Sequence, residues 1–286
     1  MAARSRSTAT MILIVGLLLV AGAAYAGPPA VPDYEVKFFL DPSRVLDSLD
    51  EPTRAAHHAL ALSSSVTRLR MLFLDSKNHD LNEAGWNVRL QSILGEEGEG
   101  GIELAYKKRY RIGDIGDRPL SQILERAASD GFSADDVNYR AQVEWGSRRT
   151  LCFTRMTMVD IPGLRRQELP EVADARRVAL KQIADKLDRA KPGGWARHIL
   201  SQAHAYGPVK GRRWSGRLDG LRLDLGVWAV RKADGKGMEP IVELSFKEDD
   251  GTKAESGRTK LERFLKAKGW LIEGDALKTE LILQRY

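Results

Sequence analysis

The stretch that decides the fold is DYEVKFFL, residues 33–40. In a β-strand, successive side chains point to opposite faces. Asp33, Glu35 and Lys37 therefore share one face, and the face opposite them is apolar. Two carboxylates and an ammonium on one short face could hold a divalent cation beside an anion. An amphipathic strand with a solvated charged face would show the same pattern, so the rest of the chain has to decide between the two.

The same alternation of charged and apolar residues returns in later predicted strands. In the clearest one, residues 102–112, Glu103 and Lys107 oppose Leu104 and Tyr106. Further strands are predicted at 66–75, 86–91, 139–145, 149–156, 212–218, 221–230, 241–247 and 279–283, and helices at 41–63, 120–128, 165–204 and 259–268. An antiparallel sheet with one wet face would explain a few such strands. So many of them also favour a closed barrel covered by helices, whose charged inner face would need a ligand, metal or water to fill it.

Composition narrows the classes of partner. The chain has 286 residues, of which 43% are hydrophobic and 29% charged, which is enough to bury a sizeable core. A net charge of +6 and a pI near 9.4 indicate a small anionic partner. Nucleic acid is not expected, because no run of clustered lysines and arginines is interleaved with aromatic residues. The single cysteine, Cys152, lies in a predicted strand and is interpreted as a core residue.

The N-terminus resembles a targeting segment. Arg4 and Arg6 precede an apolar run over 11–24, and Ala24-Tyr25-Ala26 offers a cleavage site. A membrane anchor is the alternative, but the run is short for a span of about 20 residues. We therefore expect a cleaved signal peptide at 1–26, a periplasmic or secreted protein, and no stable membrane insertion after cleavage. A leader at 27–32 and one domain at 33–286, with a helical insertion near 163–205, would follow.

A family resemblance rests on several motifs in order. Asp33-x-Glu35-x-Lys37 resembles the ExExK signature that opens CYTH domains, also called triphosphate tunnel metalloenzymes. Further segments similar to family elements are Phe73-Leu74-Asp75-Ser76, Val88-Arg89-Leu90-Gln91, Leu104-Ala105-Tyr106-Lys107, Lys210-x-x-Arg213, Val242-Glu243-Leu244-Ser245 and Lys278-Thr279-x-Leu281. Together they cover about residues 31–286, and the match is poorest over 113–205.

The resemblance implies an α+β fold, with an eight-stranded antiparallel closed β-tunnel flanked by helices. In that family, basic residues grip a triphosphate and acidic residues hold Mg²⁺ or Mn²⁺. Transferred to this chain, the implied sites are the catalytic residues Glu35 and Lys37, the phosphate-binding residues Lys37, Arg89, Lys107 and Arg213, and the metal ligands Asp33, Glu35 and Glu243. The physical chemistry agrees, because cations on several strands are needed to desolvate a triphosphate.

Three departures from the family pattern bear on activity. Asp33, Gln91 and Ser245 stand where the family has Glu, Arg and Glu. Each change removes reach or charge from the implied site. The leading hypothesis is a metal-dependent phosphohydrolase acting on a triphosphate or polyphosphate anhydride inside a basic β-tunnel. The alternatives are a non-catalytic periplasmic binding module for a phosphorylated or polyanionic ligand, and a structural envelope protein.

Overall fold

The computed structural model describes residues 27–95, 100–112, 119–165, 168–272 and 278–286, so the predicted signal peptide lies outside the described residues. The strands are β1 (Asp33–Leu40), β2 (Thr67–Asp75), β3 (Trp86–Leu94), β4 (Gly100–Ile112), β5 (Arg140–Trp145), β6 (Arg149–Val159), β7 (His204–Leu218), β8 (Leu221–Arg231) and β9 (Met238–Glu248). The helices are α1 (Pro42–Val45), α2 (Arg54–Ala59), α3 (Asp80–Glu83), α4 (Leu120–Ser129), α5 (Val172–Lys181), α6 (Asp185–Asp188), α7 (Trp195–Gln202), α8 (Gly251–Ala267) and α9 (Lys278–Arg285).

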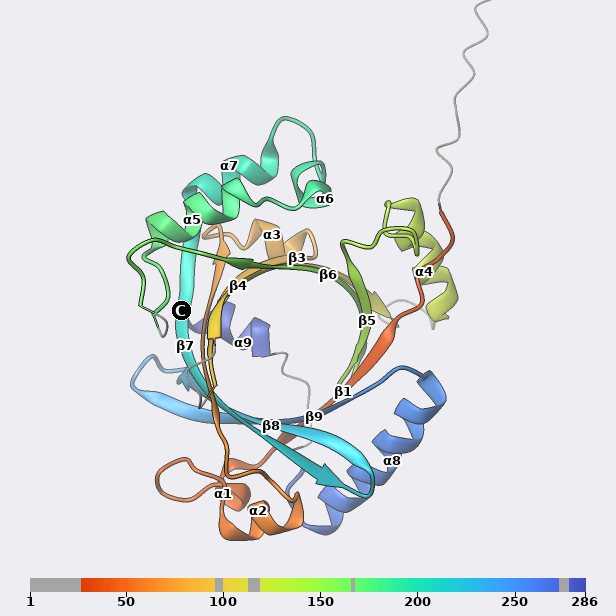
Figure 1. The fold of residues 1–286 in the computed structure, drawn as a ribbon, viewed down its shortest axis with the longest axis vertical. Helices are drawn as coiled ribbons and strands as arrows, with labels where there is room; N and C mark the ends of the chain where they lie inside the picture. Colours follow the sequence, from red (N-terminus) through yellow and green to blue (C-terminus); the bar gives the residue numbers. More distant parts are fainter. Residues whose placement is uncertain (1–26, 96–99, 113–118, 166–167, 273–277) are drawn as a thin grey trace, which may run out of the picture.

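The strands close into a barrel in the order β1-β5-β6-β4-β3-β2-β7-β8-β9 (Figure 1). The prediction of a closed barrel flanked by helices is confirmed, but its strand count and its purely antiparallel pairing are wrong. Nine strands form the barrel within the described residues, and β1 pairs with β5 in parallel. A ring with an odd number of strands cannot alternate direction throughout, so one parallel pair is unavoidable.

Helices cover the outside of the barrel (Figure 1). The apolar face of β1 is buried beneath them, and Val36, Phe38 and Leu40 belong to one core cluster with residues of α8. The approach of α8 to the barrel depends on Gly257, where a Cβ would lie 2.9 Å from the ring of Phe246. Among the described residues, no helix is long and apolar enough to cross a membrane.

On strand β2 the apolar face points into the barrel and the charged face points outward, which is the reverse of most of the other strands. Leu69, Met71 and Phe73 share a core cluster with residues of α9, and Leu69 and Met71 line a cavity inside the barrel. Because side chains alternate, Arg68 and Arg70 lie on the outer face. The sequence pattern could not assign this inversion, because it shows which residues share a face but not which face is enclosed.

The end of the chain is a helix rather than the strand predicted at 279–283. Helix α9 runs over Lys278–Arg285 and lies within the ring of strands in Figure 1. Its buried residues are Thr279, Ile282 and Leu283, at the spacing of one helical face. Ile282 and Leu283 pack on the apolar inner face of β2 in the same core cluster. The helix therefore fills part of the barrel that a ligand would otherwise occupy.

Three further helices, α5, α6 and α7, lie between β6 and β7 in the chain. They pack outside the barrel, where Ala175, Ala179, Leu187 and Leu200 join the same core cluster as the outward side chains of β3 and β4. The predicted domain boundaries, including the insertion near 163–205, stay predictions.

Candidate functional site: the charged waist of the tunnel

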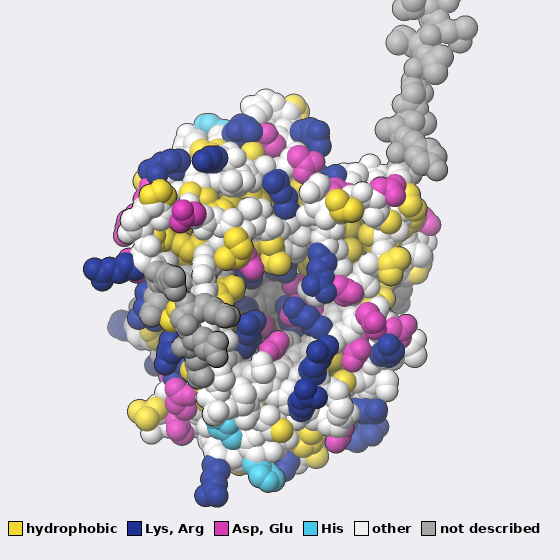
Figure 2. Space-filling view, in the orientation of Figure 1, with side chains coloured by type: hydrophobic (Ala, Val, Ile, Leu, Met, Phe, Trp, Pro, Cys, Tyr) yellow, Lys and Arg dark blue, Asp and Glu magenta, His cyan; other side chains and the backbone are white. Residues whose placement is uncertain are grey.

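Two adjoining cavities occupy the inside of the barrel. The first, of about 350 Å³, is lined on one side by the turn between β5 and β6 and by α8, with Ser147 and Arg258 among its residues. The second, of about 410 Å³, includes Glu35 and Arg213 in its lining. We call them the hairpin cavity and the strand cavity. Figure 2 shows an opening at the centre of one face of the molecule, with side chains of both charges around it.

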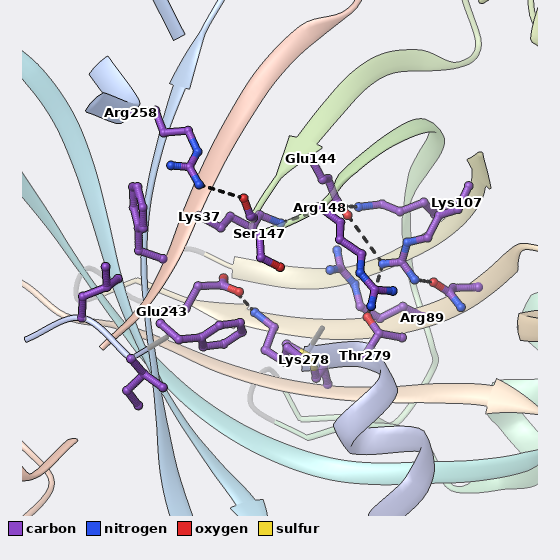
Figure 3. A pocket seen from close by; sticks show the side chains of 18 of the residues that line it. Lys37, Arg89, Lys107, Glu144, Ser147, Arg148, Glu243, Arg258, Lys278 and Thr279 are labelled. Carbon is purple, nitrogen blue, oxygen red and sulfur yellow. Dashed lines mark hydrogen bonds and ion pairs between the residues drawn. The ribbon is translucent and has the colours of Figure 1, made fainter. Parts of the chain in front are cut away.

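Charged side chains line the boundary that the two cavities share. The residues common to both linings, which we call the waist, are Lys37, Met71, Arg89, Lys107, Glu144, Glu243 and Lys278. Four of them are cations, which β1, β3, β4 and α9 supply, and two are carboxylates (Figure 3). The waist is therefore a cationic centre into which two acids project.

Glu144 of β5 is the carboxylate around which the waist is arranged. Its side chain is only 7% exposed, and its Oε1 accepts hydrogen bonds from Lys107 Nζ at 2.6 Å and from Lys37 Nζ at 3.3 Å. Arg109 Nη2 lies 3.8 Å from the other carboxylate oxygen. Burial by itself would raise the pKa of Glu144, but the three cations hold that pKa well below its usual range. Glu144 is thus firmly ionised.

Lys37 of β1 is ion-paired with Glu144 and with Glu35, which lies on the same strand as Lys37. Its Nζ lies 2.9 Å from Glu35 Oε2, so one ammonium touches two carboxylates. Burial opposes the charged form of Lys37, yet Glu144 and Glu35 raise the pKa of the ammonium well above its usual value. The pKa of Glu35 is lowered, because the attraction of Lys37 and Lys247 outweighs burial and repulsion by Glu144. All three groups are charged near neutral pH.

Two guanidinium groups in the barrel retain unused donors. Arg89 binds Glu103 through Nη2 at 2.7 Å, and Arg109 binds Asn87 and Thr279. Within the described residues, the Nε atoms of Arg89 and Arg109 are buried and have no hydrogen-bond partner. Leaving a buried charged donor unsatisfied costs on the order of 1–3 kcal/mol or more. An anion in the tunnel could accept from these donors.

Lys278 brings a fourth cation to the waist from the first turn of α9. Its Nζ lies 3.2 Å from Glu243 Oε1 (Figure 3). The same atom lies 3.9 Å from the centre of the Trp228 ring. Burial lowers the pKa of Lys278, and the nearby Lys37 and Arg89 act in the same direction, while Glu243 opposes them. The pKa of Lys278 is therefore shifted in the opposite direction from that of Lys37.

The three acids implied as metal ligands do not converge. Asp33 pairs with Arg140 Nη2 at 2.6 Å, and its side chain is 33% exposed. Glu35 is neutralised by Lys37, and Glu243 by Lys278. Over the described ranges, no group of three His, Cys, Asp or Glu residues is placed to hold a metal ion. The carboxylates present thus do not fit a preformed Mg²⁺ or Mn²⁺ site.

The implied phosphate-binding residues are brought together more closely. Lys37, Arg89 and Lys107 all lie at the waist, whereas Arg213 lines only the strand cavity. The sequence motifs assign no role to two central residues, Glu144 and Lys278. Glu144 shares the polar face of its predicted strand with Arg140 and Gln142, so that face was the available signal. Nothing in that strand alone distinguishes an acid aimed at three cations from a solvated one.

No protein-family model and no curated protein sequence matches the chain. Among solved structures, it is similar to a proposed adenylyl cyclase from Hippeastrum that has a dominant triphosphatase activity. The identity is 15% and the TM-score 0.50, over 88% of this chain and 99% of that one. A proposed adenylate cyclase from Bacillus halodurans has 11% identity and a TM-score of 0.47, over 87% of this chain and 96% of that one. The first likeness is one of fold, a closed barrel flanked by helices.

Proposed function

We propose that the chain is a CYTH-like phosphohydrolase that binds a triphosphate or polyphosphate in the tunnel and hydrolyses one of its anhydride bonds. The observation that supports this is the waist, where Lys37, Arg89, Lys107 and Lys278 converge from three strands and a helix. A linear phosphate chain carries several charges, and only cations on several walls can desolvate all of them. The triphosphatase activity of the Hippeastrum protein points in the same direction.

Binding would proceed as an exchange of anions. Without ligand, Lys37 and Lys107 are both ion-paired with Glu144. A phosphate oxygen that replaces the carboxylate keeps each ammonium paired, so the cations never become buried without a partner. The free Nε donors of Arg89 and Arg109 gain acceptors at the same time. Affinity therefore depends on the phosphate chain outcompeting one carboxylate, rather than on filling empty cationic sites.

In the proposed hydrolysis, roles in the chemical step are assigned to two residues of the chain, Lys37 and Glu35. Water attacks a terminal phosphorus, a new P–O bond forms, the bridging P–O bond breaks, and the departing phosphate takes the electron pair. Lys37 is proposed to neutralise charge that develops on the phosphate oxygens. Glu35, which lies 2.9 Å from Lys37, is proposed to orient the attacking water and accept its proton. Dependence on Mg²⁺ or Mn²⁺ stays a prediction from the family resemblance, and no step is assigned to the metal.

A second candidate is a binding module that holds the same anion without turnover. It is favoured by the pairing of Asp33, Glu35 and Glu243 with three different cations, which leaves them dispersed. In both candidates the partner is a small phosphorylated anion, and nucleic acid is not proposed. A periplasmic or secreted location after removal of residues 1–26 is likewise proposed from the sequence.

Phosphate release from inorganic tripolyphosphate tests the first candidate. The full chain is incubated with Mg²⁺, with Mn²⁺ and with a chelator, beside Glu35→Gln and Lys107→Gln. We expect release by the wild type with either metal and none with the chelator. Both variants should lose the release, and Glu255→Gln, which removes an exposed acid on α8, should not change it. Binding without release under all three conditions would establish the second candidate instead. Folded protein that neither binds nor releases phosphate would contradict both.

A further inference from the structure

Four basic side chains form a patch on the outside of the barrel. The patch, which we call the outer basic patch, consists of Arg68 and Arg70 on β2 and Lys210 and Arg212 on β7. All four line a hollow of about 310 Å³, which Asp50 also lines. The inner faces of the same strands carry the apolar cluster around α9, so the barrel wall separates the patch from the tunnel.

The strand register sets like charges directly opposite one another. Arg68 pairs with Arg212, and Arg70 pairs with Lys210, in the antiparallel ladder between β2 and β7. Like charges in directly opposed positions destabilise a sheet. Charged residues on an outer strand often protect a sheet edge, but β2 and β7 are bonded on both sides within a closed barrel and have no edge. Protection of a sheet edge therefore does not account for the opposed charges.

Among the described residues, only Arg212 of these four cations forms an ion pair. Arg212 is hydrogen-bonded to Glu51 and donates to the Asp50 carbonyl oxygen at 2.7 Å. Within the described parts of the chain, no hydrogen bond or ion pair joins a side chain to Arg68, Arg70 or Lys210. The acids that line a neighbouring hollow with Arg70 and Lys210 are Glu168, Glu171 and Asp174, and none of them is ion-paired with the patch.

We propose that the outer basic patch is a second anion site, specific for a ligand with at least two phosphoryl groups. Guanidinium groups bind phosphate through paired N–H donors. Arg68 and Arg70 stand about 7 Å apart on one strand face, so each can take one phosphoryl group. Lys210 adds a point charge from the neighbouring strand. The site does not rest on the proposed function of the tunnel.

Calorimetric titration with inorganic tripolyphosphate at low salt tests the site. The patch of the wild type is expected to bind one equivalent, in addition to any equivalent bound in the tunnel. Arg68→Gln/Arg70→Gln should lose one equivalent or weaken it at least about tenfold. The matched control Lys260→Gln/Arg263→Gln removes two exposed charges from α8 and should keep the patch equivalent. Lys107→Gln should weaken the tunnel equivalent and leave the patch equivalent intact.

A phosphatidylglycerol head group carries a single phosphodiester, but a membrane presents many side by side, so neighbouring lipids can supply two phosphate groups. A second arm therefore uses sedimentation with phosphatidylglycerol vesicles. Retention that is lost in Arg68→Gln/Arg70→Gln, and kept in the control, supports the patch with a lipid phosphate as its ligand. A lost equivalent of tripolyphosphate supports it with a free phosphate chain. If the double variant changes neither tripolyphosphate stoichiometry nor vesicle retention, the proposal is wrong.

A stability measurement without any ligand checks whether the opposed charges of β2 and β7 repel one another. Removing the opposed charges should raise the Tm of Arg68→Gln/Arg70→Gln by about 1–3 °C at low salt. The gain should shrink as salt screens the repulsion. A variant that melts lower than the wild type, or does not fold, would show that the arginines have partners in the native state and would overturn the assignment.

Discussion

The carboxylate of Glu144 lies 2.6 Å from the ammonium of Lys107, and a second ammonium, that of Lys37, shares the same oxygen atom. This arrangement makes Glu144 an internal substitute for a ligand anion. It stabilises the empty tunnel by neutralising the cations, and it occupies their hydrogen-bonding capacity. Stability of the ligand-free chain and affinity for phosphate are therefore opposed at this residue.

Replacing Glu144 with Gln should lower stability and tighten phosphate binding. The change leaves the waist cations without their shared acid, and breaking a buried ion pair costs about 3–5 kcal/mol. Tripolyphosphate should restore most of the loss, since a ligand present at about 100 times its Kd adds about 2.7 kcal/mol. Urea unfolding with and without tripolyphosphate measures both effects. The control Glu255→Gln should change neither quantity, and equal ligand stabilisation in wild type and Glu144→Gln would contradict the competition.

Acid sensitivity follows from the same carboxylate. The pKa of Glu144 in the folded chain lies well below its ordinary value of 4.5, so its stabilising contribution is present above that value. The contribution is lost as the pH falls from about 4.5 toward the folded pKa, because the unfolded chain binds the proton first. One proton corresponds to a slope of up to about 1.4 kcal/mol per pH unit. The free energy of unfolding of Glu144→Gln should therefore fall less steeply below pH 4.5 than that of the wild type.

The period-2 patterns favoured a closed barrel, because strands such as β4 place Glu103 and Lys107 on the face opposite Leu104 and Tyr106. They could not predict the parallel pair of β1 and β5, which depends on the number of strands in the ring. They also could not show that Arg68 and Arg70 lie outside. On β2 the inner face is apolar because α9 packs on it, and α9 is far away in the sequence.

The sequence predicted only part of the candidate site, because some of its contacts depend on the tertiary structure. Lys37, Arg89 and Lys107 occupy motif positions on strands whose polar face is enclosed, so their convergence was predictable. Lys278 was recognisable only as part of a closing motif, and its position at the waist depends on α9 being helical. Pairing of Asp33 with Arg140 depends on the register of β1 against β5, which no local pattern encodes.

Two adjacent lysines of β4 provide a matched pair of variants. Lys107 points to Glu144 in the tunnel, whereas Lys108 points outward and donates to the Ala84 carbonyl oxygen at 2.7 Å. Lys107→Gln should weaken tripolyphosphate binding at the tunnel at least about tenfold, because a charge-assisted contact is lost. Lys108→Gln should leave that affinity unchanged and lower only the stability. Calorimetric titration of both variants decides whether the ligand enters the barrel, and equal losses would place it elsewhere.

Chelation should separate binding from turnover. Because the metal-side acids Asp33, Glu35 and Glu243 are each paired with a cation, the waist can attract phosphate without a divalent ion. We expect the rise in Tm caused by tripolyphosphate to persist in excess EDTA, while phosphate release stops and returns on addition of Mg²⁺ or Mn²⁺. Glu35→Gln should retain the Tm shift in EDTA and show no release with either metal. If EDTA abolishes the shift in the wild type, the metal and the phosphate chain bind together, and the exchange of anions at Glu144 is not sufficient for binding.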